Sequence, residues 1–134
     1  MITIQENKII ADTKTQTVVF VDGRLTQVKS KLDGKYYLND SAQRDIPITL
    51  VYASDRTLPL GKVENCQTET TVYSDHMVNI SYGTWNGHGE LLIEEETETG
   101  AVCITPSVHS SRPGVLACRW EMYGLNPELT MTLP

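Results

Sequence analysis

The chain has 134 residues, of which 40% are hydrophobic and 21% are charged. This composition is ordinary for a folded globular protein and excludes wholesale disorder. No apolar run approaches the roughly 20 residues that a membrane-spanning helix needs, and the N-terminal sequence lacks the basic start and apolar core of a signal peptide. We therefore expect one cytoplasmic domain over residues 1–134 that does not associate with a membrane.

The net charge of −6 is divided unevenly along the chain. Residues 1–62 carry nine Lys or Arg and seven Asp or Glu, whereas residues 63–134 carry two Lys or Arg and ten Asp or Glu. The acidic second half lacks the basic footprint that nucleic acid requires, so we expect no nucleic-acid partner. The division suits a basic protein partner, or copies of this chain that meet head to tail in a homo-oligomer. A solvated surface without a partner explains it as well.

The three cysteines, Cys66, Cys103 and Cys118, are odd in number and form no CxxC pair. A secreted disulfide scaffold and a structural zinc site are therefore disfavoured. Cys103 and Cys118 alternate with apolar neighbours, and all three cysteines are predicted to be reduced and mostly buried as small core residues. The histidines are scattered without metal-ligand spacing, so we expect no metal and no other cofactor; they are His76, His88 and His109.

Short alternating stretches separated by turn signals predict β-strands from the first residues onward. Two-residue turns are expected at Glu6-Asn7, Asp22-Gly23 and Asp33-Gly34, and the Asp-Gly pairs are strong hairpin signals. The first third of the chain is thus predicted to be a run of antiparallel strands. The polar stretch from Asn39 to Asp45 has the weakest strand pattern and is expected to be a loop or a single helical turn.

The strand pattern is interrupted near residues 58–62, where Pro59 and Gly61 coincide with the change in charge balance. We interpret this interruption as a seam inside one domain, because each half is short for an independent core. The second half continues as a meander whose predicted strands are QTETTVY, HMVNISY, ELLIEEE, AVCIT and VLACRWEMY. With about ten short strands and no helical stripe, the chain is predicted to be an all-β, mainly antiparallel sandwich or partly closed barrel.

The segment TPSVHSSRPG, residues 105–114, is predicted to be a loop that connects AVCIT and VLACRWEMY as a hairpin pair. Within it, Ser107 and His109 lie two residues apart, so their side chains would point the same way on an extended backbone. A serine nucleophile and a histidine base need such a shared side. An acid such as Glu90 or Asp75 would have to complete the set. No nucleophile elbow accompanies these residues, so a connecting loop is favoured over a catalytic one.

The same loop offers a second chemistry, the binding of an anion. Ser110, Ser111 and Arg112 supply convergent donors, and arginine suits bidentate contacts with phosphate or carboxylate groups. A surface ion pair between Arg112 and the acidic residues 94–98 is the simpler explanation of this arginine.

A protein contact surface is expected around the glycine-rich stretch GTWNGHG. Tyr82, Trp85 and His88 would form an aromatic patch that a partner can use as an anchor. Beside this patch, an acidic run alternates between the two faces of a strand end, which predicts a solvated rim that suits a basic partner; the run is Glu94, Glu95 and Glu96.

These observations favour a non-enzymatic protein-binding or assembly module, such as an inhibitor, an immunity-type protein or a structural component of a larger particle. The alternative is a small β-barrel enzyme, or a protein that binds phosphate or another anion through residues 105–114.

Overall fold

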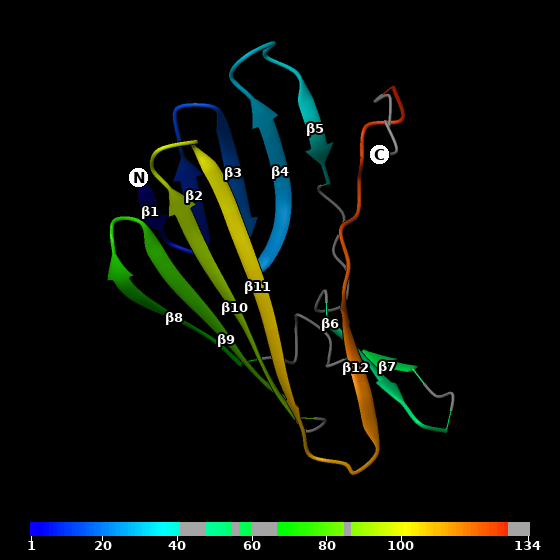
Figure 1. Ribbon diagram of the computed structural model, residues 1–134. Coiled ribbons are helices and arrows are strands. Elements are labelled where there is room, and N and C mark those ends of the chain that lie inside the picture. The colour runs from blue at the N-terminus through cyan, green and yellow to red at the C-terminus, as the bar shows by residue number, and fades with distance from the viewer. Residues whose placement is uncertain (41–47, 55–56, 60–66, 85–86, 129–134) are drawn as a thin grey trace.

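The computed structural model describes residues 1–40, 48–54, 57–59, 67–84 and 87–128. These residues confirm the predicted all-β fold: they form antiparallel sheets of five, four and three strands, arranged as a sandwich in which no sheet closes on itself (Figure 1). The described part of the chain contains no helix that is long and apolar enough to cross a membrane. The predicted loop at Asn39 to Asp45 lies mostly outside the described residues, as do residues 60–62 of the predicted seam.

The first sheet is built from consecutive hairpins, two of which have the predicted two-residue turns. The two-residue turn predicted at Asp33-Gly34 is wrong, because the longer segment 31–35 connects the fourth strand to the fifth. Both residues of the Asp22-Gly23 turn have positive φ, 50° and 76°, which is the backbone that a two-residue hairpin needs. The strands follow one another in space as they do in sequence, and are β1 (Ile2–Gln5), β2 (Lys8–Asp12), β3 (Gln16–Val21), β4 (Arg24–Ser30) and β5 (Tyr36–Asn39).

The second sheet is the predicted meander, and the third combines strands that are distant in sequence. The order β11-β10-β9-β8 comprises β8 (Gln67–Ser74), β9 (Met77–Thr84), β10 (Gly87–Glu96) and β11 (Ala101–Ser110). The order β12-β6-β7 comprises β6 (Ile48–Tyr52), β7 (Thr57–Pro59) and β12 (Val115–Trp120).

Two predictions about residues 105–114 are wrong. Strand β11 continues to Ser110, so only residues 111–114 connect it to β12. The two strands are also not a hairpin pair, because β11 pairs with β10 whereas β12 pairs with β6 (Figure 1).

Strand β12 is irregular near its start. The irregularity lies between Val115 and Ala117, and Leu116 has 72% of its surface exposed, although its position alternates in line with Cys118 and Trp120.

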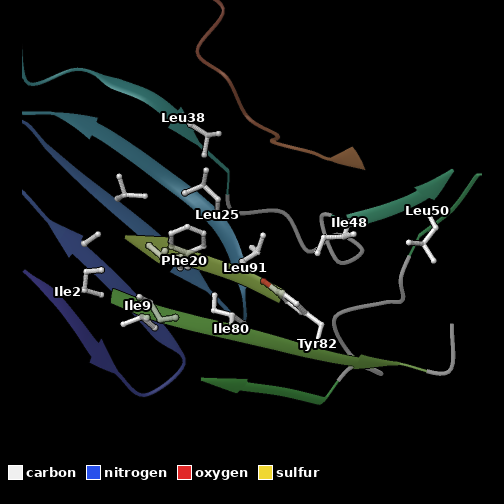
Figure 2. Close-up of a cluster of buried hydrophobic side chains, with 14 of the residues drawn as sticks. Ile2, Ile9, Phe20, Leu25, Leu38, Ile48, Leu50, Ile80, Tyr82 and Leu91 are labelled. Atoms are coloured by element: carbon white, nitrogen blue, oxygen red, sulfur yellow. The ribbon is translucent and has the colours of Figure 1, made fainter. Parts of the chain in front are cut away.

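The hydrophobic core lies between the five-stranded and four-stranded sheets. Phe20 and Leu25 from the first sheet face Ile80, Tyr82 and Leu91 from the second (Figure 2). Side chains of β6 extend the same cluster. Because the first sheet precedes the predicted seam and the second sheet follows it, the core draws on both sides of that seam.

The prediction that the cysteines are buried is only partly met. Cys118 packs against the core cluster, but Cys103 is exposed because it lies on the outer face of β11. Cys66 lies outside the described residues.

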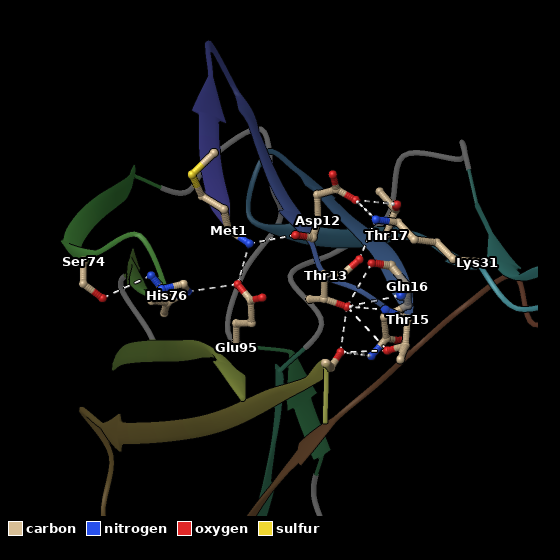
Figure 3. Close-up of polar contacts among 11 residues, drawn as sticks. Met1, Asp12, Thr13, Thr15, Gln16, Thr17, Lys31, Ser74, His76 and Glu95 are labelled. Atoms are coloured by element: carbon tan, nitrogen blue, oxygen red, sulfur yellow. Dashed lines mark hydrogen bonds and ion pairs between the residues drawn. The ribbon is translucent and has the colours of Figure 1, made fainter. Parts of the chain in front are cut away.

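Polar contacts hold the two larger sheets together beside the core (Figure 3). Gly100, in the turn between β10 and β11, has its carbonyl oxygen within hydrogen-bonding distance of Thr13 Oγ1 at 2.7 Å and of Thr15 Oγ1 at 3.0 Å. This close approach depends on glycine, because Gly100 has φ +77° and an added Cβ would lie 2.8 Å from Thr15 Oγ1. The turn is therefore anchored to the first sheet by its backbone.

Glu95 makes a second polar link between the sheets, which corrects the prediction that it belongs to a solvated rim. Its side chain is only 8% exposed. The carboxylate accepts hydrogen bonds from the amino group of Met1 at 2.5 Å and from Nδ1 of His76 at 3.1 Å (Figure 3). The hydrogen bond from Met1 is the main reason that the pKa of Glu95 is lowered, and the bond from His76 adds to it.

Gly100→Ala is expected to lower the free energy of unfolding by about 1–3 kcal/mol more than Gly34→Ala, as measured by urea denaturation. Both glycines have positive φ, so both substitutions carry the same kind of backbone strain, but nothing lies within 4 Å of a Cβ at Gly34. Equal losses for the two variants would show that the close approach at Gly100 contributes nothing.

Glu95→Gln is expected to make stability less dependent on pH in the acidic range. Because the folded-state pKa of Glu95 is lowered, its contribution is fully present above the usual carboxylate pKa and is lost as the pH falls through the folded value. The variant should be less stable by about 1 kcal/mol at pH 7, a modest figure because the Met1 amino group is largely exposed, and the difference should vanish in acid. Urea denaturation at a series of pH values tests this, with Glu94→Gln as the neighbouring control.

Candidate functional site

The register of the second sheet gathers several predicted site residues on its outer face, the side turned away from the core. Ser107 lies opposite Glu90 on β10, and His109 lies opposite His88. Ser81 on β9 lies opposite Glu90 from the other side. Side chains two residues apart on a strand share a face, so these positions form two adjacent rows across the sheet.

The hydrogen bonds on this outer face connect only part of the cluster. Nε2 of His88 lies 3.2 Å from Oε1 of Glu90 and 3.4 Å from Oγ of Ser81. Within the described residues, Ser107 and His109 make no side-chain hydrogen bond and are both exposed. A serine nucleophile needs a base in contact with it, and this arrangement has no such contact between described residues.

A shallow hollow of about 390 Å³ crosses the same face. Tyr73 and Met77 lie at one end, and Glu90 and Ser107 lie at the other. The remaining lining residues are Asn79, Leu92 and Thr105, which occupy one row across β9, β10 and β11. The lining mixes apolar and polar groups with a single carboxylate, which suits side chains of a bound peptide better than a compact anion.

The residues predicted to bind an anion do not lie on this face. Ser110 alternates with His109 and points to the other side of β11, where its hydroxyl lies 3.0 Å from Tyr52 Oη. The same hydroxyl accepts the backbone N–H of Arg112 at 3.0 Å. Ser111 and Arg112 are exposed in the short turn before β12. The predicted loop is therefore divided between a strand face and a separate turn.

The predicted aromatic patch is corrected at Tyr82, which is a core residue. Only 1% of its surface is exposed, and its hydroxyl donates a hydrogen bond to the carbonyl oxygen of Gly23. His88 is exposed on the outer face, and Trp85 lies outside the described residues. Of the acidic run, Glu94 lies on the outer face opposite Met77 and Cys103, while Glu96 accepts a hydrogen bond from Thr99.

Strand β8 is the most accessible element of this sheet, although nothing in the predictions singled it out. All eight of its residues are exposed, including 57% of Val72 and 61% of Tyr73. Its outer edge is paired with no other strand of the described chain. The signal for an open edge was present in the sequence QTETTVYS, which is rich in β-branched residues and has no lysine or proline.

The other edges of the two larger sheets differ from β8. The backbone N–H of Ile2 on β1 donates to Asp75 O at 2.6 Å, and β5 is bridged by Leu38 to Leu125 of the C-terminal segment. Strand β11 carries Pro106, which lacks a backbone N–H to offer to an added strand. Among the described edges of these sheets, β8 is thus the one with every residue exposed, although its pairing with β9 is irregular between Val72 and Ser74.

The second sheet and its turns carry charge of one sign. Residues 67–110 contain seven Asp or Glu and no Lys or Arg. Glu69 is the only charged residue of β8, and Glu90 and Glu94 share the outer face with it. A basic segment placed along this edge would meet a favourable potential.

Comparison of the chain with models of known families, with known proteins and with solved structures finds no match.

Proposed function

We propose that the chain is a non-enzymatic protein-binding module that receives an extended basic segment of a partner as an additional strand along β8. The observation that supports this most is the exposure of Thr68 to Ser74 on β8, at an edge with which no other described strand pairs. Backbone hydrogen bonds to such an edge supply affinity, and side chains of alternate residues supply specificity. An inhibitor, an immunity-type protein or a component of a larger particle would work in this way.

The charge of the sheet favours lysine and arginine in the added strand. Side chains that point to the outer face would approach Glu69 first and Glu90 beyond it. Contacts between exposed charges contribute mainly to orientation and to the rate of association, and they weaken as salt is added. Tyr73, exposed beside the hollow, offers the apolar surface that holds the contact.

A defined peptide tests this mode of binding. An eight-residue peptide in which lysine alternates with threonine is expected to bind at least about tenfold more tightly than its glutamate–threonine counterpart, as measured by fluorescence anisotropy. On binding, the backbone amides of β8 should become protected from hydrogen exchange. Equal affinity of the two peptides, or protection confined to another edge, would contradict the proposal.

Thr71→Lys and Thr97→Lys form a matched pair of variants for the same assay. Both threonines are exposed, but Thr71 lies on β8, whereas Thr97 lies in the turn between β10 and β11, outside the hollow. An edge lysine opposes strand addition, so Thr71→Lys should weaken binding about tenfold and Thr97→Lys by less than about twofold.

A second copy of the chain is the competing occupant of this edge. Sedimentation of the protein alone is expected to show a monomer at micromolar concentration. If it instead shows an oligomer that Thr71→Lys dissociates and Thr97→Lys does not, the β8 edge serves homo-oligomer formation and the basic partner is ruled out as its main occupant.

A further inference from the structure

A second hollow, of about 420 Å³, lies on the outer face of the five-stranded sheet, separated from β8 by the core. Its floor is made by two rows of the sheet: Lys8, Val21 and Arg24 lie opposite one another, and Val19, Gln27 and Asn39 form the next row. Asp22, Thr26 and Asp40 complete the lining. We call this hollow the Arg24 pocket.

Arg24 is buried although it lies on the outer face. Its side chain is 8% exposed, and Nη1 donates to Oδ2 of Asp40 at 3.0 Å. Among the described residues, this is the one hydrogen bond that its side chain makes. A guanidinium carries five N–H donors in a planar fork, so most of the donors of this group lack a protein partner within the described chain. No nitrogen of Arg24 is both fully buried and without a partner, so these other donors remain accessible to solvent and to a ligand that brings acceptors.

The surrounding backbone fixes Asp40 and, through it, Arg24. The N–H of Asp40 donates to Thr26 O at 2.7 Å, where β4 has an extra residue relative to β3. On the other side, Gly124 has φ +81°, and a Cβ there would lie 2.6 Å from Cβ of Asp40. Asp40 is thus held between β4 and the segment around Gly124. Its carboxylate orients the guanidinium of Arg24 through Nη1.

We propose that the Arg24 pocket binds a small carboxylate. The remaining edge of the guanidinium matches a carboxylate in a bidentate contact, and the ammonium of Lys8, in the same row, provides a second cationic donor. Asp22 and Asp40 balance these two charges, so a molecule with hydroxyl groups beside its carboxylate suits the pocket better than a compact polyanion. The amides of Gln27 and Asn39 would hydrogen-bond such hydroxyls. The volume lies within the roughly 300–1,000 Å³ of known ligand sites.

Thermal denaturation of the full chain with lactate, malate and citrate tests the pocket, with lactamide as the uncharged match for lactate and sodium chloride at equal ionic strength. At ten times its dissociation constant, a ligand should raise the Tm by roughly 5 °C. In ¹⁵N–¹H spectra the same ligand should shift the amide signals of Gly23 and Thr26. If no carboxylate raises the Tm beyond lactamide and salt, the pocket holds only water and the proposal fails.

Lys8→Gln and Lys29→Gln provide the matched variants. Both lysines lie on the outer face of the same sheet and both changes remove one charge, but Lys29 lies over the ring of Tyr36, outside the pocket. Lys8→Gln should weaken carboxylate binding at least about fivefold, and Lys29→Gln should leave it within about twofold.

Arg24→Lys tests the guanidinium itself. It keeps the positive charge beside Asp40 but removes the planar fork of N–H donors, so it should abolish the ligand-induced amide shifts at Gly23 and Thr26. Equal effects of the two glutamine variants, or unchanged shifts in Arg24→Lys, would overturn the assignment.

Discussion

Tyr82 connects the two larger sheets by packing and by hydrogen bonding at once. Its ring lies in the core beside residues of β10, and its hydroxyl donates to the carbonyl oxygen of Gly23 in the turn between β3 and β4 (Figure 2). The contact requires glycine, because a Cβ at position 23 would lie 2.7 Å from Cε1 of the tyrosine ring. A buried hydroxyl needs a partner, so the position of this turn and the burial of Tyr82 depend on each other.

The position of that turn also determines what lies on the two outer surfaces. Arg24 follows Gly23 directly, and Lys8 lies in the same row on the far side of Val21, so the pairing of β3 sets the positions of both cationic groups of the pocket. On the other sheet, the alternation that buries Val78, Ile80 and Tyr82 turns the intervening residues of β9 outward, toward the hollow beside β8. The core thus separates a polar, charge-balanced surface on the first sheet from an acidic one on the second.

Local sequence accounts for the strands and turns, but not for the choice of partners. Asp22-Gly23 specifies its hairpin because few other residues tolerate the positive φ that such a turn needs, whereas Asp33-Gly34 lies in the longer connection of residues 31–35. Nothing in VLACRWEMY indicates that β12 pairs with β6, more than 60 residues earlier, instead of the nearby β11. The burial of Glu95 likewise depends on Met1, 94 residues away in the sequence. The alternation in HMVNISY does place Tyr82 on the same strand face as Val78 and Ile80, so the burial of Tyr82 could have been predicted from the sequence. The burial of Arg24 could not be predicted, because it accompanies an ion pair with Asp40, a residue that the segment around Gly124 in turn packs against.

The β8 edge, with which no other described strand pairs, also affects the chain in isolation. Such an edge is a template for unwanted pairing between copies, and β8 has no proline or lysine to prevent it, although the irregularity between Val72 and Ser74 interrupts the row. The net charge of −6 is then the main protection, because copies repel one another before their edges meet. Salt shortens the range of that repulsion to about 8 Å at physiological ionic strength, so the colloidal stability of the purified protein should fall as ionic strength rises. The composition of the storage buffer therefore matters more for this chain than for one whose sheet edges are all covered.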